Sequence, residues 1–227
     1  MPDVGSLIQS RQECGLLPHH DFILVCRMPE SVARTPLAED RAAGAMALLI
    51  IDMLSDWDFA DAGPLLAQAE RIAPRIAELK RRCKACRVSV IYANDNQGRW
   101  RSDFRDVVER ALHSGGPGAR IAEQLGPEAD DYFVLKPKHS GFHATPLDLL
   151  LRHLKVATVV LTGVSSDQCV LYTAADARMH DYKAIVPRDA VATQTEARNE
   201  LVLRHFEEVL KLEVPAAADV RFPAPPS

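Results

Sequence analysis

The sequence predicts one α/β domain in three layers, with a doubly wound, mostly parallel sheet between helices. Short runs such as 47–52 and 157–163 are apolar throughout, which is typical of strands covered on both faces. These runs alternate with helical stretches of about ten residues or more, the rhythm of successive βαβ units. Right-handed crossovers between parallel strands then place helices on both faces of the sheet.

Three strands are predicted in the first half of this domain, over 47–52, 88–93 and 131–136. A helix is predicted over 64–86, where apolar side chains recur at helical spacing. Pro74 lies inside this stretch and is expected either to kink the helix or to mark its true start. A second helix is predicted over 103–113, and the Gly- and Pro-containing segment 114–118 is predicted to be a loop.

The second half repeats the alternation. Helices are predicted over 146–153, 168–180 and 196–205, and strands over 157–163, 183–187 and, as a last short strand, 207–212. The regular pattern therefore spans 45–213. Residues 1–44 show no sustained periodicity and are predicted to form an N-terminal extension, with 214–227 as a C-terminal tail.

Composition excludes several classes of function. The chain has 27 Lys and Arg against 31 Asp and Glu, and the basic residues are scattered, which argues against nucleic-acid binding. The longest apolar run, 45–51, is far short of the roughly 20 residues that a membrane span needs. The first residues lack the pattern of a secretory signal, and five cysteines at no framework spacing suit a reducing compartment. We expect a cytoplasmic protein.

Reactive side chains stand where three predicted strands end. Asp52 ends the first strand and Lys136 the third, while Cys169 follows the fourth strand at the start of a helix. Because the carboxyl ends of parallel strands share one edge of the sheet, the three are expected to meet there. A helix start and a nearby ammonium favour the thiolate, and a carboxylate could take the thiol proton and later return it. The residues alone support two interpretations of Cys169 equally: a catalytic nucleophile, or a small apolar side chain buried in the core.

Three segments carry a family resemblance: IIDMLSDWDF (50–59), KPKHSGFHATPLDLLL (136–151) and LTGVSSDQCVLYTAADA (161–177). Together they resemble the isochorismatase-like cysteine hydrolase superfamily over about 45–213. The segments 94–104 and 130–142 together resemble an uncharacterised subgroup of it. The resemblance implies the doubly wound fold, an Asp-Lys-Cys catalytic triad at Asp52, Lys136 and Cys169, and a homo-oligomer, a dimer or tetramer. It also implies a cis peptide at Val164–Ser165 that aims the N–H groups of Ser165 and Cys169 at an oxyanion.

Departures from the family pattern narrow the expected chemistry. Metal-binding relatives carry His after the second strand, whereas 92–104 contains none, so we expect no metal and no cofactor. Cys169 favours covalent attack on a carbonyl, that is, hydrolysis of an amide or related C–N bond in a small-molecule substrate. Two alternatives stay open: hydrolysis of an isochorismate-like vinyl ether through Asp52, and a catalytically idle partner-binding module that docks through the extension.

Aromatic residues beside the motifs are candidates for a substrate pocket. Trp57, Phe59, Trp100 and Phe142 flank the motif positions, although simple packing is the competing interpretation. Asp167, two residues before the thiol, is interpreted as a cap of the following helix. Cys83 and Cys86 form a lone CxxC with no second pair or His, and are interpreted as structural.

Overall fold

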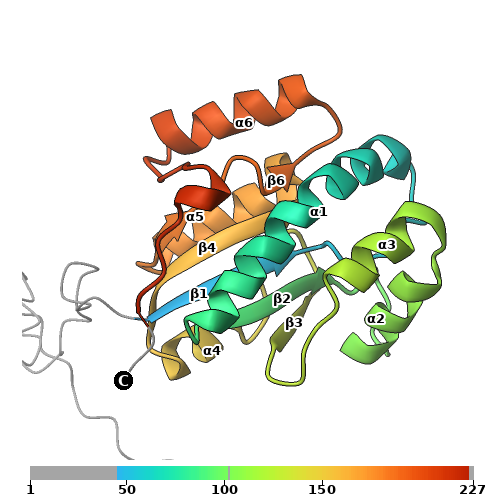
Figure 1. Ribbon diagram of the computed structural model, residues 1–227, viewed down its shortest axis with the longest axis horizontal. Coiled ribbons are helices and arrows are strands. Elements are labelled where there is room, and N and C mark those ends of the chain that lie inside the picture. Colours follow the sequence, from blue (N-terminus) through green and yellow to red (C-terminus); the bar gives the residue numbers. More distant parts are fainter. Residues whose placement is uncertain (1–44, 102, 225–227) are drawn as a thin grey trace, which may run out of the picture. The chain divides into compact units, whose positions relative to one another are not determined.

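A six-stranded sheet forms the centre of the computed structural model, which describes residues 45–101 and 103–224 (Figure 1). The strand order is β3-β2-β1-β4-β5, with β6 pairing β4, and every pairing between strands is parallel. The chain therefore winds outward from β1 to β3 and then returns to β4 on the other side of β1. The strands are β1 (Ala45–Ile51), β2 (Ser89–Asp95), β3 (Tyr132–Lys136), β4 (Val156–Val164), β5 (Lys183–Ile185) and β6 (Val191–Ala192).

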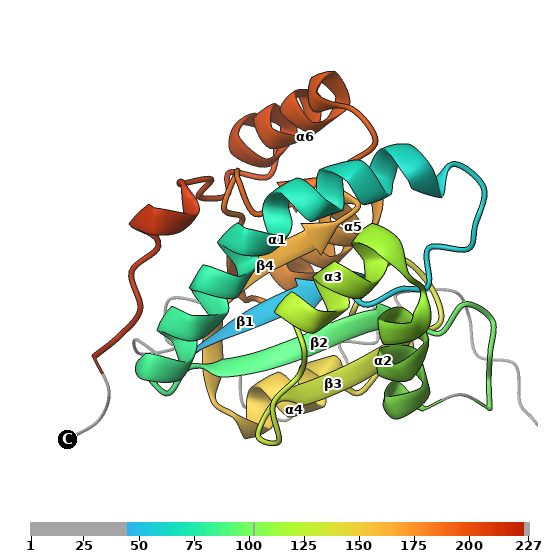
Figure 2. The same cartoon turned by 45° about the vertical axis from the view of Figure 1, so that its right-hand side comes forward.

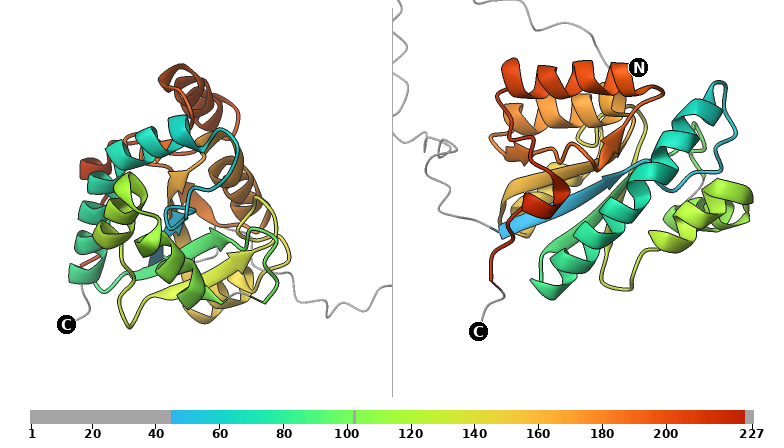
Figure 3. Two further views of the ribbon diagram at one scale, coloured as in Figure 1. Left: turned by 90° about the vertical axis from the view of Figure 1, so that its right-hand side faces the viewer. Right: turned by 45° about the horizontal axis from the view of Figure 1, so that its top comes forward.

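Helices cover both faces of this sheet, which confirms the predicted fold class (Figures 2 and 3). In Figure 2, α1, α2 and α3 lie in front of the sheet, and α4 and α5 lie behind it. A π-helical turn, η2 (Ser166–Val170), leads directly into α5, and a short 3-10 turn, η3, spans Ala217–Asp219. The helices are α1 (Ala62–Ala85), α2 (Phe104–His113), α3 (Gly116–Gln124), α4 (Leu147–His153), α5 (Leu171–Met179) and α6 (Glu196–Glu208).

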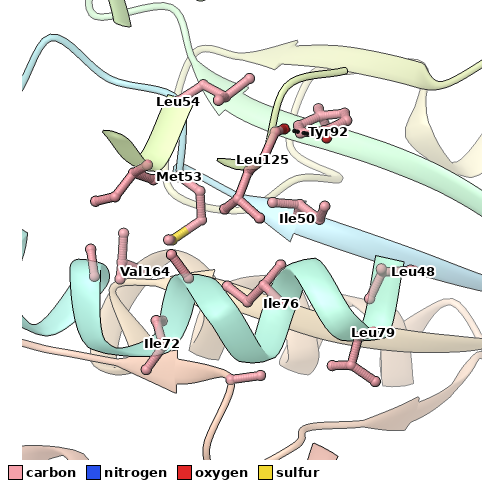
Figure 4. Close-up of a cluster of buried hydrophobic side chains, with 14 of the residues drawn as sticks. Leu48, Ile50, Met53, Leu54, Ile72, Ile76, Leu79, Tyr92, Leu125 and Val164 are labelled. Carbon is pink, nitrogen blue, oxygen red and sulfur yellow. Dashed lines mark hydrogen bonds between the residues drawn. The ribbon is translucent and has the colours of Figure 1, made fainter. Parts of the chain in front are cut away.

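Both faces of β1 are buried, as its continuous apolar run predicts. Leu48 and Ile50 face α1, where they join a cluster that contains Ile76 (Figure 4). Leu49 and Ile51 belong to the cluster on the other face. Full burial of such a side chain stabilises the fold by about 1.5–3 kcal/mol, so the central strand is strongly held in place.

Close contact between β1 and β4 depends on one glycine. Gly163 lies opposite Ile51 and adopts a φ of +104°, a conformation that L side chains rarely adopt. A Cβ atom at this position would lie 2.0 Å from the carbonyl oxygen of Ile51. Because both strands end near this contact, Gly163 lets the segments that follow them, with Asp52 and Cys169, lie side by side.

The long first helix agrees with its prediction, and the segment after α2 does not. Helix α1 runs through Pro74 without ending, so the alternative that Pro74 marks its start is wrong. The predicted loop over 114–118 is also wrong in its second half, because α3 begins at Gly116. Pro117 fits the first turn of α3, where its missing N–H is not needed. Burial of Ile121 and Ala122 against the α1 face stabilises this short helix.

The end of the domain differs from the sequence prediction too. No strand forms over 207–212, because α6 continues to Glu208 and only Glu213 makes an isolated parallel bridge, to Ile185. The short strand β6 was not predicted. The π-helical turn η2 begins two residues before the helix predicted over 168–180. The predicted extension, 1–44, lies outside the described residues. Across 45–101 and 103–224, no helix is long and apolar enough to span a membrane.

Candidate active site

Asp52, Lys136 and Cys169 meet at the carboxyl edge of the sheet, as the sequence predicts. Asp52 directly follows β1, Lys136 is the last residue of β3, and Cys169 lies in η2 after β4. The Lys136 Nζ atom lies 2.7 Å from Asp52 Oδ2 and donates a hydrogen bond to Cys169 Sγ at 3.4 Å. The ammonium thus bridges the carboxylate and the thiol.

Backbone contacts hold the Asp52 carboxylate in one orientation. The Asp52 N–H donates to the Ala93 carbonyl at 3.1 Å, and Asp52 Oδ1 accepts the Asp95 N–H at 2.7 Å. Asp52 has a φ of +51°, in the left-handed region that Asp visits more readily than most residues. Both carboxylate oxygens therefore have fixed partners, one on β2 and one on Lys136.

Lys136 is fully buried and stays charged. Burial is the largest single influence and would lower the pKa of its ammonium, but the Asp52 carboxylate, Cys169 and Asp95 together outweigh it. The pKa of Lys136 is therefore above its ordinary value. Asp95 Oδ2 lies 3.6 Å from Lys136 Nζ, so a second carboxylate, at the end of β2, faces the same ammonium.

The Cys169 thiol is protonated at neutral pH. Burial raises its pKa, and the negative charge of Asp52 raises it further, whereas Lys136 offsets only part of the rise. The ammonium does favour the thiolate, as the sequence analysis expects, but the net direction of the pKa is upward. The reason is that burial and the adjacent carboxylate together outweigh the single cation.

The turn that carries the thiol is fixed by a polar network around Asp167. The Val164–Ser165 peptide bond is cis, as expected from the resemblance. Asp167 Oδ1 accepts hydrogen bonds from Ser165 Oγ at 2.8 Å and from Thr193 Oγ1 at 2.7 Å, and Oδ2 pairs with Arg198. Burial raises the pKa of Asp167, but these partners outweigh it and hold the carboxyl below its usual range. Asp167 therefore links the turn to Thr193, directly after β6, and to α6, and its interpretation as a helix cap is wrong.

A cavity of about 590 Å³ opens beside Asp52 and Cys169. Asp52 and Cys169 line it, together with Val164 and Ser165 at the cis peptide. Trp57 and Phe59 supply aromatic surface, with ring centroids 6.3 Å apart. The remaining lining side chains are mostly polar and include Asp58, Asn94, Asp95, Gln97, Arg99, His139, Gln168 and Gln194.

Of the four aromatic candidates for the pocket, Trp57 and Phe59 line the cavity, and Trp100 and Phe142 do not. Trp100 is 79% exposed and stands outside the cavity lining. Phe142 is buried in the core on the α4 and α5 face, where its ring lies 5.0 Å from the His180 ring and stacks on it. Sequence proximity to a motif was misleading for both, because the Trp100 side chain is exposed to solvent and the Phe142 side chain packs in the core.

The loop after β2 does not fit a transition-metal site. It carries Asp95 and Gln97 near the triad, but Asp95 Oδ1 already accepts the Gln97 N–H at 2.6 Å. Across the described residues, no group of three or more His, Cys, Asp or Glu side chains is arranged to hold a metal ion. An amide in this loop is a poor ligand for zinc, which prefers imidazole and thiolate.

His139 is a residue of the site that the sequence analysis missed. Its Nδ1 atom lies 3.8 Å from Cys169 Sγ, and its ring stacks on Tyr172 with centroids 5.6 Å apart. It stands three residues after Lys136, inside the segment KPKHSGF that carried the resemblance. Its position, only three residues after a candidate catalytic lysine, was the sequence feature that could have identified it as a site residue.

The sequence and the fold are both similar to those of known proteins. The isochorismatase domain profile matches residues 46–214. The uncharacterized isochorismatase family protein YaaI of Bacillus subtilis is 37% identical over 169 residues, covering 74% of this chain and 92% of YaaI. The ureidoacrylate amidohydrolase RutB of Methylorubrum extorquens is 28% identical, covering 68% of this chain and 72% of RutB. The N-carbamoylsarcosine amidase structure from Thermoplasma acidophilum superposes with a TM-score of 0.61 and 27% identity, covering 78% and 99% of the two chains.

Proposed function

The chain belongs to the isochorismatase family of hydrolases. We propose that it hydrolyses an amide or related C–N bond through an acyl intermediate on Cys169. One observation carries the proposal: Lys136 Nζ lies 3.4 Å from the thiol and 2.7 Å from the Asp52 carboxylate, and the thiol and carboxylate line the cavity. A nucleophile beside a base that a third group orients is the arrangement of covalent catalysis. The similarity to a ureidoacrylate amidohydrolase and an N-carbamoylsarcosine amidase supports a C–N bond as the target.

Acylation begins with transfer of the thiol proton to Asp52. Because the thiol is neutral at rest, this transfer accompanies the attack of Sγ on the substrate carbonyl. Lys136 keeps its charge throughout and stabilises the developing thiolate. The backbone N–H groups of Ser165 and Cys169 would hold the carbonyl oxygen as it becomes negative.

The tetrahedral adduct then breaks its C–N bond. Asp52 gives the proton it has taken to the departing nitrogen, which leaves as a neutral amine or ammonia. An acyl group remains on Cys169 as a thioester, and water hydrolyses it to free the acid and the thiol. One substrate molecule and one water thus yield an acid and an amine.

Intact-protein mass spectrometry tests the acyl intermediate. Wild-type protein and the Cys169→Ser variant would each be mixed with a panel of small amides, ureido compounds and activated esters, then quenched in acid. We expect an acyl adduct that peptide mapping places on Cys169 in the wild type, and no adduct at position 169 in the variant. Hydrolysis of a panel compound without any adduct, unchanged in Cys169→Ser, would instead favour a noncovalent reaction through Asp52. Absence of all turnover and adducts would favour a partner-binding module.

A further inference from the structure

The contact between His139 and the thiol has no role in the acylation described above. The imidazole Nδ1 atom lies 3.8 Å from Cys169 Sγ, on a segment that also lines the cavity. Stacking on Tyr172 at an interplanar angle of 17° holds the ring against α5 and beside the sulfur. His139 is also exposed, so the ring contacts solvent as well as the cavity.

Asp52 is poorly arranged to activate the water of the second step. Its Oδ1 atom accepts the Asp95 N–H at 2.7 Å, and its Oδ2 atom lies 2.7 Å from a fully buried ammonium. An imidazole open to solvent faces no such constraint, and a neutral imidazole is a good proton acceptor near neutral pH. The two candidate bases therefore differ in access to water, although both lie beside Sγ.

We propose that His139 is the catalytic base of deacylation, which takes a proton from water and passes a proton to Cys169 Sγ. This inference rests on the proposed acyl-enzyme chemistry. Water loses a proton to the imidazole as its oxygen bonds to the thioester carbon. The C–S bond then breaks, and the imidazolium returns a proton to the departing sulfur. Atoms and charge balance: thioester and water become acid and thiol, and His139 ends neutral.

The environment of the sulfur supports this proton return. Burial and Asp52 raise the pKa of the Cys169 thiol, so a thiolate released there is a poor leaving group unless an acid protonates it. The other groups facing the sulfur are Lys136, which stays charged, and Asp52, which is a carboxylate again once the amine has left. A protonated His139 is the acid in contact with the sulfur at this stage.

The experiment separates the two half-reactions with p-nitrophenyl acetate. Acylation is followed as the burst of p-nitrophenolate, which leaves without needing a proton, and deacylation as the steady-state rate after the burst. With this ester, Asp52 releases the thiol proton to solvent through the cavity that it lines, so it is again a carboxylate before deacylation. His139→Phe keeps a planar ring to stack on Tyr172, and His143→Phe is a matched control at an exposed histidine outside the cavity lining. We expect His139→Phe to keep the burst rate, to lose about 10²–10⁴-fold in the steady state, and to accumulate acetyl-Cys169. His143→Phe should behave as wild type.

A second variant tests whether the effect of His139→Phe comes from the lost base or from altered packing around the thiol. His139→Ala should also accumulate acetyl-Cys169, and added imidazole should restore its deacylation in proportion to the imidazole concentration. Equal deacylation in His139→Phe and wild type would overturn the inference, as would an equal loss of burst and steady-state rates without imidazole rescue. If wild-type Cys169 is not acetylated at all, the acyl-enzyme proposal fails and this inference fails with it.

Discussion

At its carboxyl end, β3 places Lys136 against Asp52 beside a thiol, whereas at its amino end Asp131 meets Lys80 and Lys84. Both ends thus bury a lysine against a carboxylate, and Lys80 Nζ lies 2.9 Å from Asp131 Oδ2. The ion pairs at the amino end of β3 are shielded from solvent. The Asp131 side chain is 1% exposed, and Lys80 also donates to the Gly126 carbonyl at 2.6 Å. The Asp52 side chain is 17% exposed and lines the cavity.

The comparison shows that a buried lysine–carboxylate pair does not by itself indicate catalysis. At the amino end the charges are satisfied by one another and by backbone, so their role is to connect α1 with the segment before β3. At the carboxyl end the same pair borders the Cys169 thiol and an open cavity. Removing the carboxylate at the amino end should therefore affect stability alone. Removing Asp52, which also leaves the buried Lys136 ammonium with only Asp95 nearby, should affect both stability and chemistry.

Replacing Asp52 by Asn should have the largest effect on activity. Asn keeps the shape and the hydrogen-bonding oxygen but cannot take the thiol proton, so turnover of an identified amide substrate should fall about 10²–10⁴-fold. Steady-state assays of purified protein would measure this loss, and circular dichroism would verify that the fold is retained. Retention of near-normal turnover would mean that another residue is the base.

Replacing Asp131 by Asn should instead destabilise the fold. Loss of this partner leaves the buried Lys80 ammonium with only the exposed Glu128 carboxylate, 3.3 Å away, and the free energy of unfolding should drop by about 3 kcal/mol. Urea denaturation would measure this drop, and turnover per folded molecule should not change. Asp130→Asn is the matched control: this exposed neighbour also pairs with Lys84, and its loss should matter much less. A fall in turnover with unchanged stability in Asp131→Asn would contradict the comparison.

Alkylation of Cys169 should respond to pH and to Asp52 in a defined direction. Because the pKa of the thiol is raised, iodoacetamide should label Cys169 slowly at pH 7, and about tenfold faster per pH unit as pH rises. Removing the Asp52 charge lowers that pKa, so Asp52→Asn should be labelled faster at pH 7 even though it has lost turnover. Quantitative peptide mapping would follow Cys169 and, as a control remote from the site, Cys86. Rapid labelling of the wild type at pH 7 would show that the resting site holds a thiolate.

Removal of metal should have the smallest effect. The residues around the cavity do not form a transition-metal site, and the thiol supplies the nucleophile, so chelation should leave activity unchanged. Elemental analysis before and after treatment with a chelator would accompany the assay. About one zinc or iron per chain, with activity lost on removal, would place the protein with the metal-dependent amidases.

Most strands and helices could be predicted because their signals are local. The apolar run at 47–52 identifies β1 wherever the rest of the chain lies, and the helical spacing before and after Pro74 outweighs the local preference of that one residue. Failures occurred where local and distant contributions compete. The start of α3 looks like a loop, and burial of Ile121 stabilises it as a helix. The run 207–212 has the composition of a strand, but α6 extends into it.

Other expectations remain predictions. The cytoplasmic location, the homo-oligomer and the predicted extension over 1–44 concern partners and segments on which the described domain does not bear. Part of the predicted C-terminal tail is described and packs on the domain: Ala217 and Val220 are buried in the cluster on the α1 face, and Arg82 donates to both of their carbonyls. The oxyanion role of Ser165 and Cys169 belongs with the proposed chemistry. The acyl-adduct experiment addresses that chemistry directly.

By itself, the sequence determined that Asp52, Lys136 and Cys169 would share one edge of a parallel sheet, because strand ends are marked by the limits of apolar runs and parallel strands align those ends. Only the tertiary structure decided the protonation of the thiol, since this depends on burial and on the balance between Asp52 and Lys136. It also decided that Trp100 and Phe142 lie outside the cavity, while His139 touches the sulfur. Such contacts join residues distant in sequence, and no local pattern encodes the distance between them.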